Sequence, residues 1–193
     1  MVDFEKLKLY KQYLNTIQDL LDSYFENQKE YLACKKGCSY CCEKGQYPYS
    51  ELEFEYLLAG FMGLPDNEKR EIIERIKELK ETYNGEMYRC PFLGKDNTCM
   101  VYNYRGLICR TFGLLKPDKN GEIIMPFCQS LGLNYSKVYD KERKMLDENL
   151  IKNGGYKNTP KAYQIGLKTL MSEDLFEGEP LKFGEIKSLI DWL

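Results

Sequence analysis

Hydrophobic residues near the start of the chain recur at alternating steps of three and four, with charged residues between them, from residue 4 to about residue 32. The repeating positions are Leu7, Tyr10, Leu14, Ile17, Leu21 and Tyr24. An α-helix turns once in about 3.6 residues, so this spacing places the apolar side chains on one face. The sequence predicts a long amphipathic helix that leads directly to Cys34.

Two more helices are predicted in the next part of the chain. Ser50 followed by Glu53 is the pattern of a capping box, and the apolar run that it opens ends before Gly63. Asp66 or Asn67 is expected to cap the second helix. The apolar face of that helix is formed by Ile72, Ile73, Ile76, Leu79 and Tyr83. We expect the two helices to form a hairpin.

Residues 87–135 differ in composition from the helical segments: Gly, Pro, Asp and Asn are frequent, and the apolar runs are short. This composition predicts loops, with a short hairpin around Lys119-Asn120-Gly121. Beyond it, the pattern predicts further helices and one turn. The helices are expected at 136–151, 159–171 and 183–193, and the turn at Glu177-Gly178-Glu179-Pro180.

The predicted fold is mainly α: a helical domain with a loop-rich cysteine and metal knot. We expect residues 1–193 to form a single domain. Its parts are an N-terminal helix at 1–33, a cysteine-cluster core at 34–135 and C-terminal helices at 136–193. The longest apolar stretch, at 56–65, is about half of what a membrane span needs.

Charge and composition narrow the class of protein. The chain carries 28 basic and 30 acidic residues, scattered along its length, and a formal net charge of −2. The sequence therefore lacks the cluster of basic residues that binding to nucleic acid or to a membrane surface requires, so neither partner is expected. We expect a cytoplasmic protein. In a reducing cytosol, closely spaced cysteines are typical of metal or redox sites rather than of disulfides.

Cysteine is the residue type that carries the candidate chemistry. The chain has eight, and the first four crowd into the run CKKGCSYCC. They are Cys34, Cys38, Cys41, Cys42, Cys90, Cys99, Cys109 and Cys128. The chain contains no histidine, which excludes mixed cysteine and histidine zinc sites and histidine-based catalytic triads. All eight thiols are therefore candidate ligands, and thiolate sites favour zinc or iron–sulfur clusters.

Several interpretations of the cysteines stay open. Buried apolar cysteines, disulfides and a zinc site compete with an iron–sulfur cluster. The spacing Cys34-x3-Cys38-x2-Cys41 also matches radical S-adenosylmethionine enzymes, but their barrel needs repeated strand–helix units that are not predicted here. We favour a [4Fe-4S] cluster. The basic residues Arg105 and Arg110, which flank Cys109 along the chain, would offset its negative charge and act as its cofactor-binding residues.

The cysteine pattern resembles a known family. Cys34, Cys38, Cys41 and Cys42 are followed by Cys90-Pro91-Phe92-Leu93, by Cys99-x2-Tyr102-x2-Arg105-x3-Cys109-Arg110-x-Phe112, and by Cys128. This combination is similar to the YkgJ-type, or CxxCxxCC, cysteine-cluster family, whose domain is described as zinc- or iron-chelating. The family includes the cysteine-rich part of flagellin lysine methylases. In this chain the first gap holds three residues rather than two, and Gly106 replaces a common proline.

The predicted function is therefore metal binding on thiolates, by an iron–sulfur cluster or by zinc, with redox or electron transfer as the expected role. Two alternatives remain: a methyltransferase-like enzyme, implied by the resemblance alone, and a structural zinc module that binds other proteins. No glycine-rich nucleotide motif supports a conventional methyltransferase. Eight thiolates could serve two four-ligand sites or one cluster with accessory cysteines. We favour a shared centre to which both cysteine groups contribute.

Overall fold

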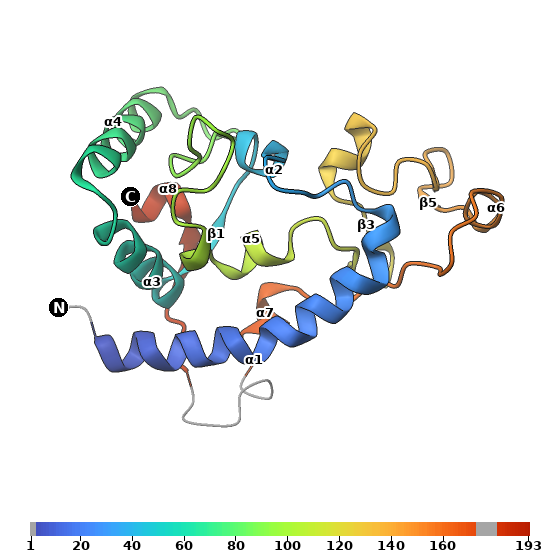
Figure 1. Cartoon of the computed structure of the whole chain (residues 1–193), viewed down its shortest axis with the longest axis horizontal. Helices are drawn as coiled ribbons and strands as arrows, with labels where there is room; N and C mark the ends of the chain where they lie inside the picture. The colour runs from blue at the N-terminus through green and yellow to red at the C-terminus, as the bar shows by residue number, and fades with distance from the viewer. Residues whose placement is uncertain (1–2, 173–180) are drawn as a thin grey trace.

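The computed structural model describes residues 3–172 and 181–193. The long helix α1, Phe4–Gln28, runs along one side of the molecule and continues into the 3-10 turn η1, Lys29–Tyr31 (Figure 1). The side chain of Asp3 caps α1 by accepting from the backbone N–H groups of Glu5 and Lys6. The predicted amphipathic helix is confirmed, and it delivers the chain to Cys34.

The helices α3, Glu51–Met62, and α4, Asp66–Thr82, lie together at one end of the molecule (Figure 1). The predicted capping box is confirmed, because Ser50 Oγ accepts from the Glu53 N–H and the Glu53 carboxylate accepts from the Ser50 N–H. The predicted cap of α4 is wrong. Pro65 is the N-cap, and Asp66 is already the first helical residue.

The segment between α4 and residue 135 consists of short elements joined by loops. The predicted hairpin around Asn120 is confirmed, because β2 pairs antiparallel with β3 and the Asp118 carboxylate accepts from the N–H groups of Asn120 and Glu122. The elements are η2, Tyr102–Tyr104, α5, Leu107–Thr111, β2, Lys116–Pro117, β3, Ile123–Ile124, and η3, Phe127–Leu131. In Figure 1, α5 lies between α1 and the short helix α2, Tyr40–Glu43.

The long helix predicted at 136–151 is wrong. Two short strands, β4, Tyr139–Asp140, and β5, Met145–Leu146, form an antiparallel hairpin there, followed by the short helix α6, Glu148–Asn153. The Asp140 carboxylate accepts from two backbone N–H groups inside the turn, and Lys144 takes a left-handed φ of 54°. These local turn contacts end the helical conformation that the apolar spacing suggested.

The helix predicted at 159–171 is also wrong, except for the short α7, Leu167–Leu170. Residues 159–166 are irregular because tertiary hydrogen bonds hold them against other segments. The N–H of Tyr163 donates to the carbonyl of Leu115, and Gln28 of α1 donates to the carbonyl of Lys161. Contacts of this kind outweigh weak helix propensity.

The helix predicted at 183–193 is wrong over its first half. Strand β6, Ile186–Ser188, pairs antiparallel with β1, Pro48–Ser50, and only α8, Leu189–Trp192, is helical. The turn expected at 177–180 lies outside the described residues. Helix is the main regular structure, as predicted, and each sheet among the described residues has two strands.

Buried side chains form three clusters that position the cysteines. The first joins one face of α1 to α3 and α5, and the second joins α3, α4, β1 and α8 to the loop that follows α4. The third lies around Tyr31, Leu115, Tyr135 and Val138. Across the described residues, no helix combines the length and apolar character that crossing a membrane requires.

Candidate metal centre

Three cysteines pack against the second buried cluster, and Cys42 is their electrostatic neighbour; we call Cys42, Cys90, Cys99 and Cys109 the inner set. The N–H of Cys90 donates to the carbonyl of Cys42 at 2.8 Å, which ties α2 to the loop after α4. Cys99 faces Leu93 in an isolated β-bridge, and Cys109 lies on α5. Cys90, Cys99 and Cys109 are half-buried and pack against the cluster.

Electrostatic contacts show that these thiols are neighbours. Burial, and then the neighbouring thiols of Cys109, Cys42 and Cys99, raises the pKa of Cys90 well above its ordinary value. Burial also raises the pKa of Cys109 to about 12, with Cys42 and Cys99 adding to the effect. The pKa is raised at three of the four thiols, and a metal ion would favour their ionised form because its charge offsets the repulsion between thiolates.

Backbone N–H groups point at two of the inner sulfurs. The Phe92 N–H donates to the sulfur of Cys90, and the Val101 N–H donates to the sulfur of Cys99, each from two residues further along the chain. Hydrogen bonds of this kind favour the ionised thiolate and so oppose the effect of burial. Pro91 and Met100 occupy the middle positions of these two turns. The turns therefore prepare both sulfurs to act as ligands.

Tyr49 supplies a third donor, which the sequence did not single out. Its hydroxyl lies 3.5 Å from Cys109 Sγ and accepts from the Gly106 N–H at 3.0 Å. Because that N–H already occupies the oxygen, the hydroxyl hydrogen is left to donate to the sulfur, and it lowers the pKa of Cys109. Tyr49 lies on β1 next to the capping residue Ser50. Among sixteen tyrosines, no spacing rule distinguished it.

The two predicted arginines have different surroundings. Arg105 stacks on the Tyr102 ring at 3.6 Å from its centroid, and its charge lowers the pKa of Cys42, Cys99 and Cys109 after the larger effects at each thiol. Arg110 instead donates to the carbonyls of Arg105 and Asn103, at 3.0 and 2.9 Å. Arg105 thus acts by its charge on three of the inner thiols, whereas Arg110 fixes the loop that carries Arg105 and has Cys109 as an electrostatic neighbour.

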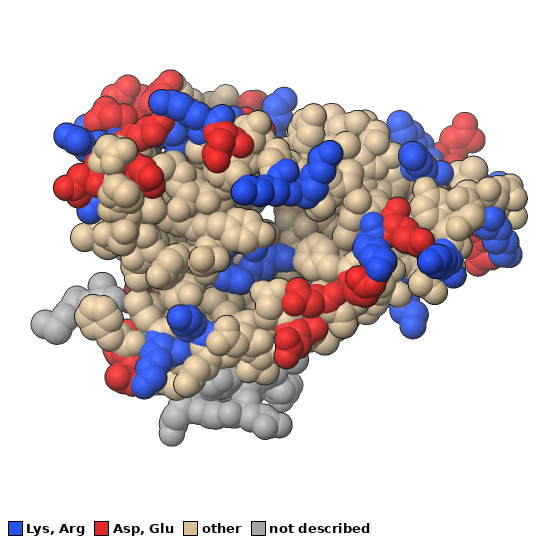
Figure 2. All heavy atoms as spheres, in the orientation of Figure 1, with Lys and Arg blue, Asp and Glu red and all other residues tan. Residues whose placement is uncertain are grey.

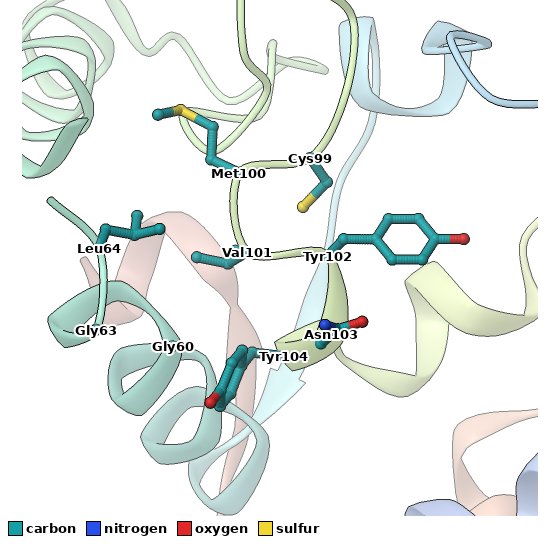
Figure 3. Close-up of a pocket in the computed structure, with 9 residues that line it drawn as sticks. All are labelled: Gly60, Gly63, Leu64, Cys99, Met100, Val101, Tyr102, Asn103 and Tyr104. Carbon is teal, nitrogen blue, oxygen red and sulfur yellow. The ribbon is translucent and has the colours of Figure 1, made fainter.

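A basic hollow and a shallow cavity adjoin the inner set. Figure 2 shows the hollow near the middle of this face, with basic side chains inside it, at the place where Figure 1 draws α5 between α1 and α2. The cavity, of about 280 Å³, is lined by residues 99–104, by Gly60 of α3, and by Gly63 and Leu64, which follow that helix. Figure 3 draws this cavity: Val101 points toward Leu64, whereas Tyr102 points the opposite way. The ring of Tyr104 takes the space that a side chain at Gly60 would need.

We call the other four cysteines the outer set: Cys34 and Cys38 precede α2, Cys41 lies on α2, and Cys128 lies on η3. Cys34 is exposed and Cys128 is buried in η3. The thiols of Cys34 and Cys38 both raise the pKa of Cys128, which burial has already raised, to about 11. Across residues 3–172 and 181–193, neither the inner set nor the outer set brings three acidic or thiol side chains close enough together to enclose a metal ion.

Comparison with known proteins identifies the class of this site. Residues 33–129, about half of the chain, match the CxxCxxCC family, a putative zinc- or iron-chelating domain. The chain belongs to this family, and the match supports metal binding by the cysteine segment. No curated protein and no solved structure matches the chain.

Proposed function

We propose that this protein binds a [4Fe-4S] cluster through the inner set and serves as a redox or electron-transfer protein. The observation that carries the proposal is that the thiols of Cys42, Cys90, Cys99 and Cys109, from α2, the 90–99 loop and α5, are electrostatic neighbours, and that three of them pack against a buried apolar cluster. Three of these sulfurs receive a hydrogen bond from Phe92, Val101 or Tyr49. Four cysteine thiolates are the usual ligand set of such a cluster.

The surroundings of the inner set support a redox role. When bound, an iron–sulfur cluster supplies one-electron chemistry, and its potential depends on net charge, on hydrogen bonds to sulfur and on exposure to solvent. The chain provides a charge at Arg105, the donors named above and partial burial. These are the features by which a protein sets a potential.

The same four thiols would also suit zinc. A tetrahedral ion held by four thiolates would tie together α2, the 90–99 loop and α5, and it would act as a structural element. The N–H contacts to Cys90 and Cys99 favour either metal, because both require thiolates. The identity of the metal is therefore the point that the experiment has to decide.

The test is anaerobic purification without chelator, followed by analysis of iron, sulfide and zinc and by visible spectroscopy. We expect a brown protein whose broad absorption bleaches on addition of dithionite. Cys99→Ser and Cys109→Ser should lose this absorption, whereas the matched control Met87→Leu, at an exposed position, should keep it. A colourless protein that holds zinc even after reconstitution with iron and sulfide would overturn the iron–sulfur proposal and favour the structural zinc module.

A further inference from the structure

We propose that the outer set is a second metal site, separate from the inner set, with Cys34, Cys38, Cys41 and Cys128 as its ligands. The proposal rests on the thiolate chemistry of the proposed function and adds a second centre to it. Four observations carry it: the contacts of Asn134, the space left at Gly113, the positions of the four thiols and the unpaired amide of Gln129.

Asn134 joins two segments that are distant in the sequence. It is 1% exposed, and its Oδ1 accepts from the Ala33 N–H at 2.8 Å. Its Nδ2 lies 3.2 Å from Cys34 Sγ and donates to it, while its backbone N–H donates to the sulfur of Cys128. One buried residue therefore contacts both the first and the last cysteine of the chain, and it favours the thiolate form of both.

Gly113 leaves the room that this contact needs. Its φ of 100° lies in the left-handed region, which favours glycine. A Cβ at this position would lie 2.9 Å from Cys34 Sγ and 3.0 Å from Asn134 Nδ2. Real side chains do not approach so closely, so the backbone after α5 is shaped to admit the Cys34 thiol.

Cys38 and Cys41 are the other two proposed ligands. Cys38 follows a tight turn in which its N–H donates to the Lys35 carbonyl at 2.9 Å, and its thiol is an electrostatic neighbour of Cys34 and Cys128. The Cys41 thiol has Cys42, Cys109 and Cys34 as neighbours, so it lies between the two sets. The inner set has four ligands without Cys41, which leaves Cys41 for the outer set.

Gln129 adds a donor without an acceptor. It follows Cys128 in η3 and is 7% exposed, and its Nε2 has no hydrogen-bond partner among the described residues. A buried N–H that lacks an acceptor is costly, and it suits a site whose bound group brings acceptor atoms. The sulfide of a cluster or the thiolate of a loaded site is such an acceptor.

The extent of the family match agrees with this assignment. The match begins one residue before Cys34 and ends one residue after Cys128. The outer set thus spans the matched domain from end to end, and the inner set lies inside it. A family defined by the inner set alone would not need to extend to either limit.

The test counts metal centres per chain by native mass spectrometry and metal analysis of anaerobically loaded protein. We expect two centres in the wild type and one in each of Cys38→Ser and Cys128→Ser, with the inner spectrum intact. Cys90→Ser and Cys99→Ser should lose the other centre. A wild type with one centre, lost only in the inner variants, would overturn the second site and leave the proposed function standing. Two zinc ions per chain would support the second site and overturn the iron–sulfur function.

Asn134 provides a finer test of the same site. Asn134→Ala should let a chelator remove the outer centre about 10-fold faster or more, as expected when a residue that orients a ligand is lost. The inner centre and the helical circular dichroism serve as folding controls, and Asn149→Ala, at an exposed position of α6, is the matched variant. Equal release from Asn134→Ala and Asn149→Ala would contradict the role of Asn134.

Discussion

Cys41 and Cys42 are consecutive residues whose thiols lie 4.0 Å apart, yet they have different neighbours. Cys42 is close to Cys90, Cys99 and Cys109, whereas Cys41 also approaches Cys34. Both lie on the short helix α2, where consecutive side chains point about 100° apart. This divergence directs one thiol toward each set, and it places the proposed centres close together.

Arg105 should tune the inner centre. Its charge acts on three of the four inner thiols. A positive charge favours the more negative, reduced state of a cluster, so Arg105→Gln should lower the reduction potential. The shift should be on the order of 50 mV, which corresponds to about 1 kcal/mol of partly screened Coulomb energy. Spectroelectrochemical titration of the loaded protein measures it.

Arg110→Gln is the matched control for that experiment. Its guanidinium holds the carbonyls of Asn103 and Arg105 and lies 3.4 Å from the Gln18 oxygen. We expect a loss of about 2 kcal/mol of stability, as for other hydrogen bonds from a charged group, with a smaller change of potential. A larger shift of potential in Arg110→Gln than in Arg105→Gln would reverse the roles assigned to the two arginines.

Glu53 should make stability depend on pH. Its carboxyl is 0% exposed and accepts from Ser50 and from the Leu107 N–H, which links α3 to the helix that carries Cys109. Burial raises the pKa of Glu53 above its ordinary value of 4.5, so the folded state binds the proton more tightly than the unfolded state does. Stability from this group therefore increases as pH falls through the raised pKa toward 4.5.

Glu53→Gln should remove this contribution. The difference in unfolding free energy between wild type and variant should shift in favour of the wild type as pH falls over that range. Urea unfolding of both apo-proteins at matched pH values measures the difference, in which the titration of all other groups cancels. A constant difference across the range would show that the carboxyl does not titrate in the folded state as described.

Metal removal should loosen residues 87–135 more than α1 or α4. Four of the eight candidate ligands lie in this segment, which is built from short elements and loops. Because metal binding is coupled to folding, chelation should raise amide hydrogen exchange there while the long helices stay protected. Hydrogen-exchange mass spectrometry of the loaded and chelated protein compares the segments directly. Uniform protection in both states would contradict the coupling.

Trp192 should report on the metal of the inner set. It is the one tryptophan of the chain, its indole N–H donates to the Tyr49 carbonyl at 2.9 Å, and its ring stacks on Phe54. Tyr49 in turn reaches Cys109. Iron–sulfur clusters absorb where tryptophan emits, so loading should quench the fluorescence and removal should restore it. Zinc, which has no such absorption, should leave the emission strong. Loss of the emission in Trp192→Phe would show that it comes from this residue.

Sequence reasoning succeeded where structure is set locally. The period of α1 and the capping box at Ser50 depend on residues within one or two turns, and both are confirmed. It failed at 159–166, where the Tyr163 N–H donates to the carbonyl of Leu115 and the side chain of Gln28 donates to the carbonyl of Lys161. Apolar spacing alone does not contain that information.

The candidate site also has features that the sequence predicts and features that depend on contacts between distant residues. Eight cysteines and no histidine predict thiolates as the ligand type. The roles of Tyr49 and Asn134 were not predicted, because each contact joins residues that are far apart in the chain. The separate neighbours of Cys41 and Cys42 were equally hidden, since they depend on the direction of two side chains on α2.

The order of the two sets along the chain has a consequence for assembly. Cys42 to Cys109 lie wholly between Cys41 and Cys128, so the loop closed by the inner site is nested within the loop closed by the outer one. Closing a long loop costs chain entropy that increases with its length. Once the inner ligands are joined, the chain between the outer ligands is effectively shortened. Only the residues before Cys42 and those from Cys109 to Cys128 still separate them. For the two proposed sites, filling the inner one first would make the outer one easier to close, which predicts that the inner site is loaded before the outer site.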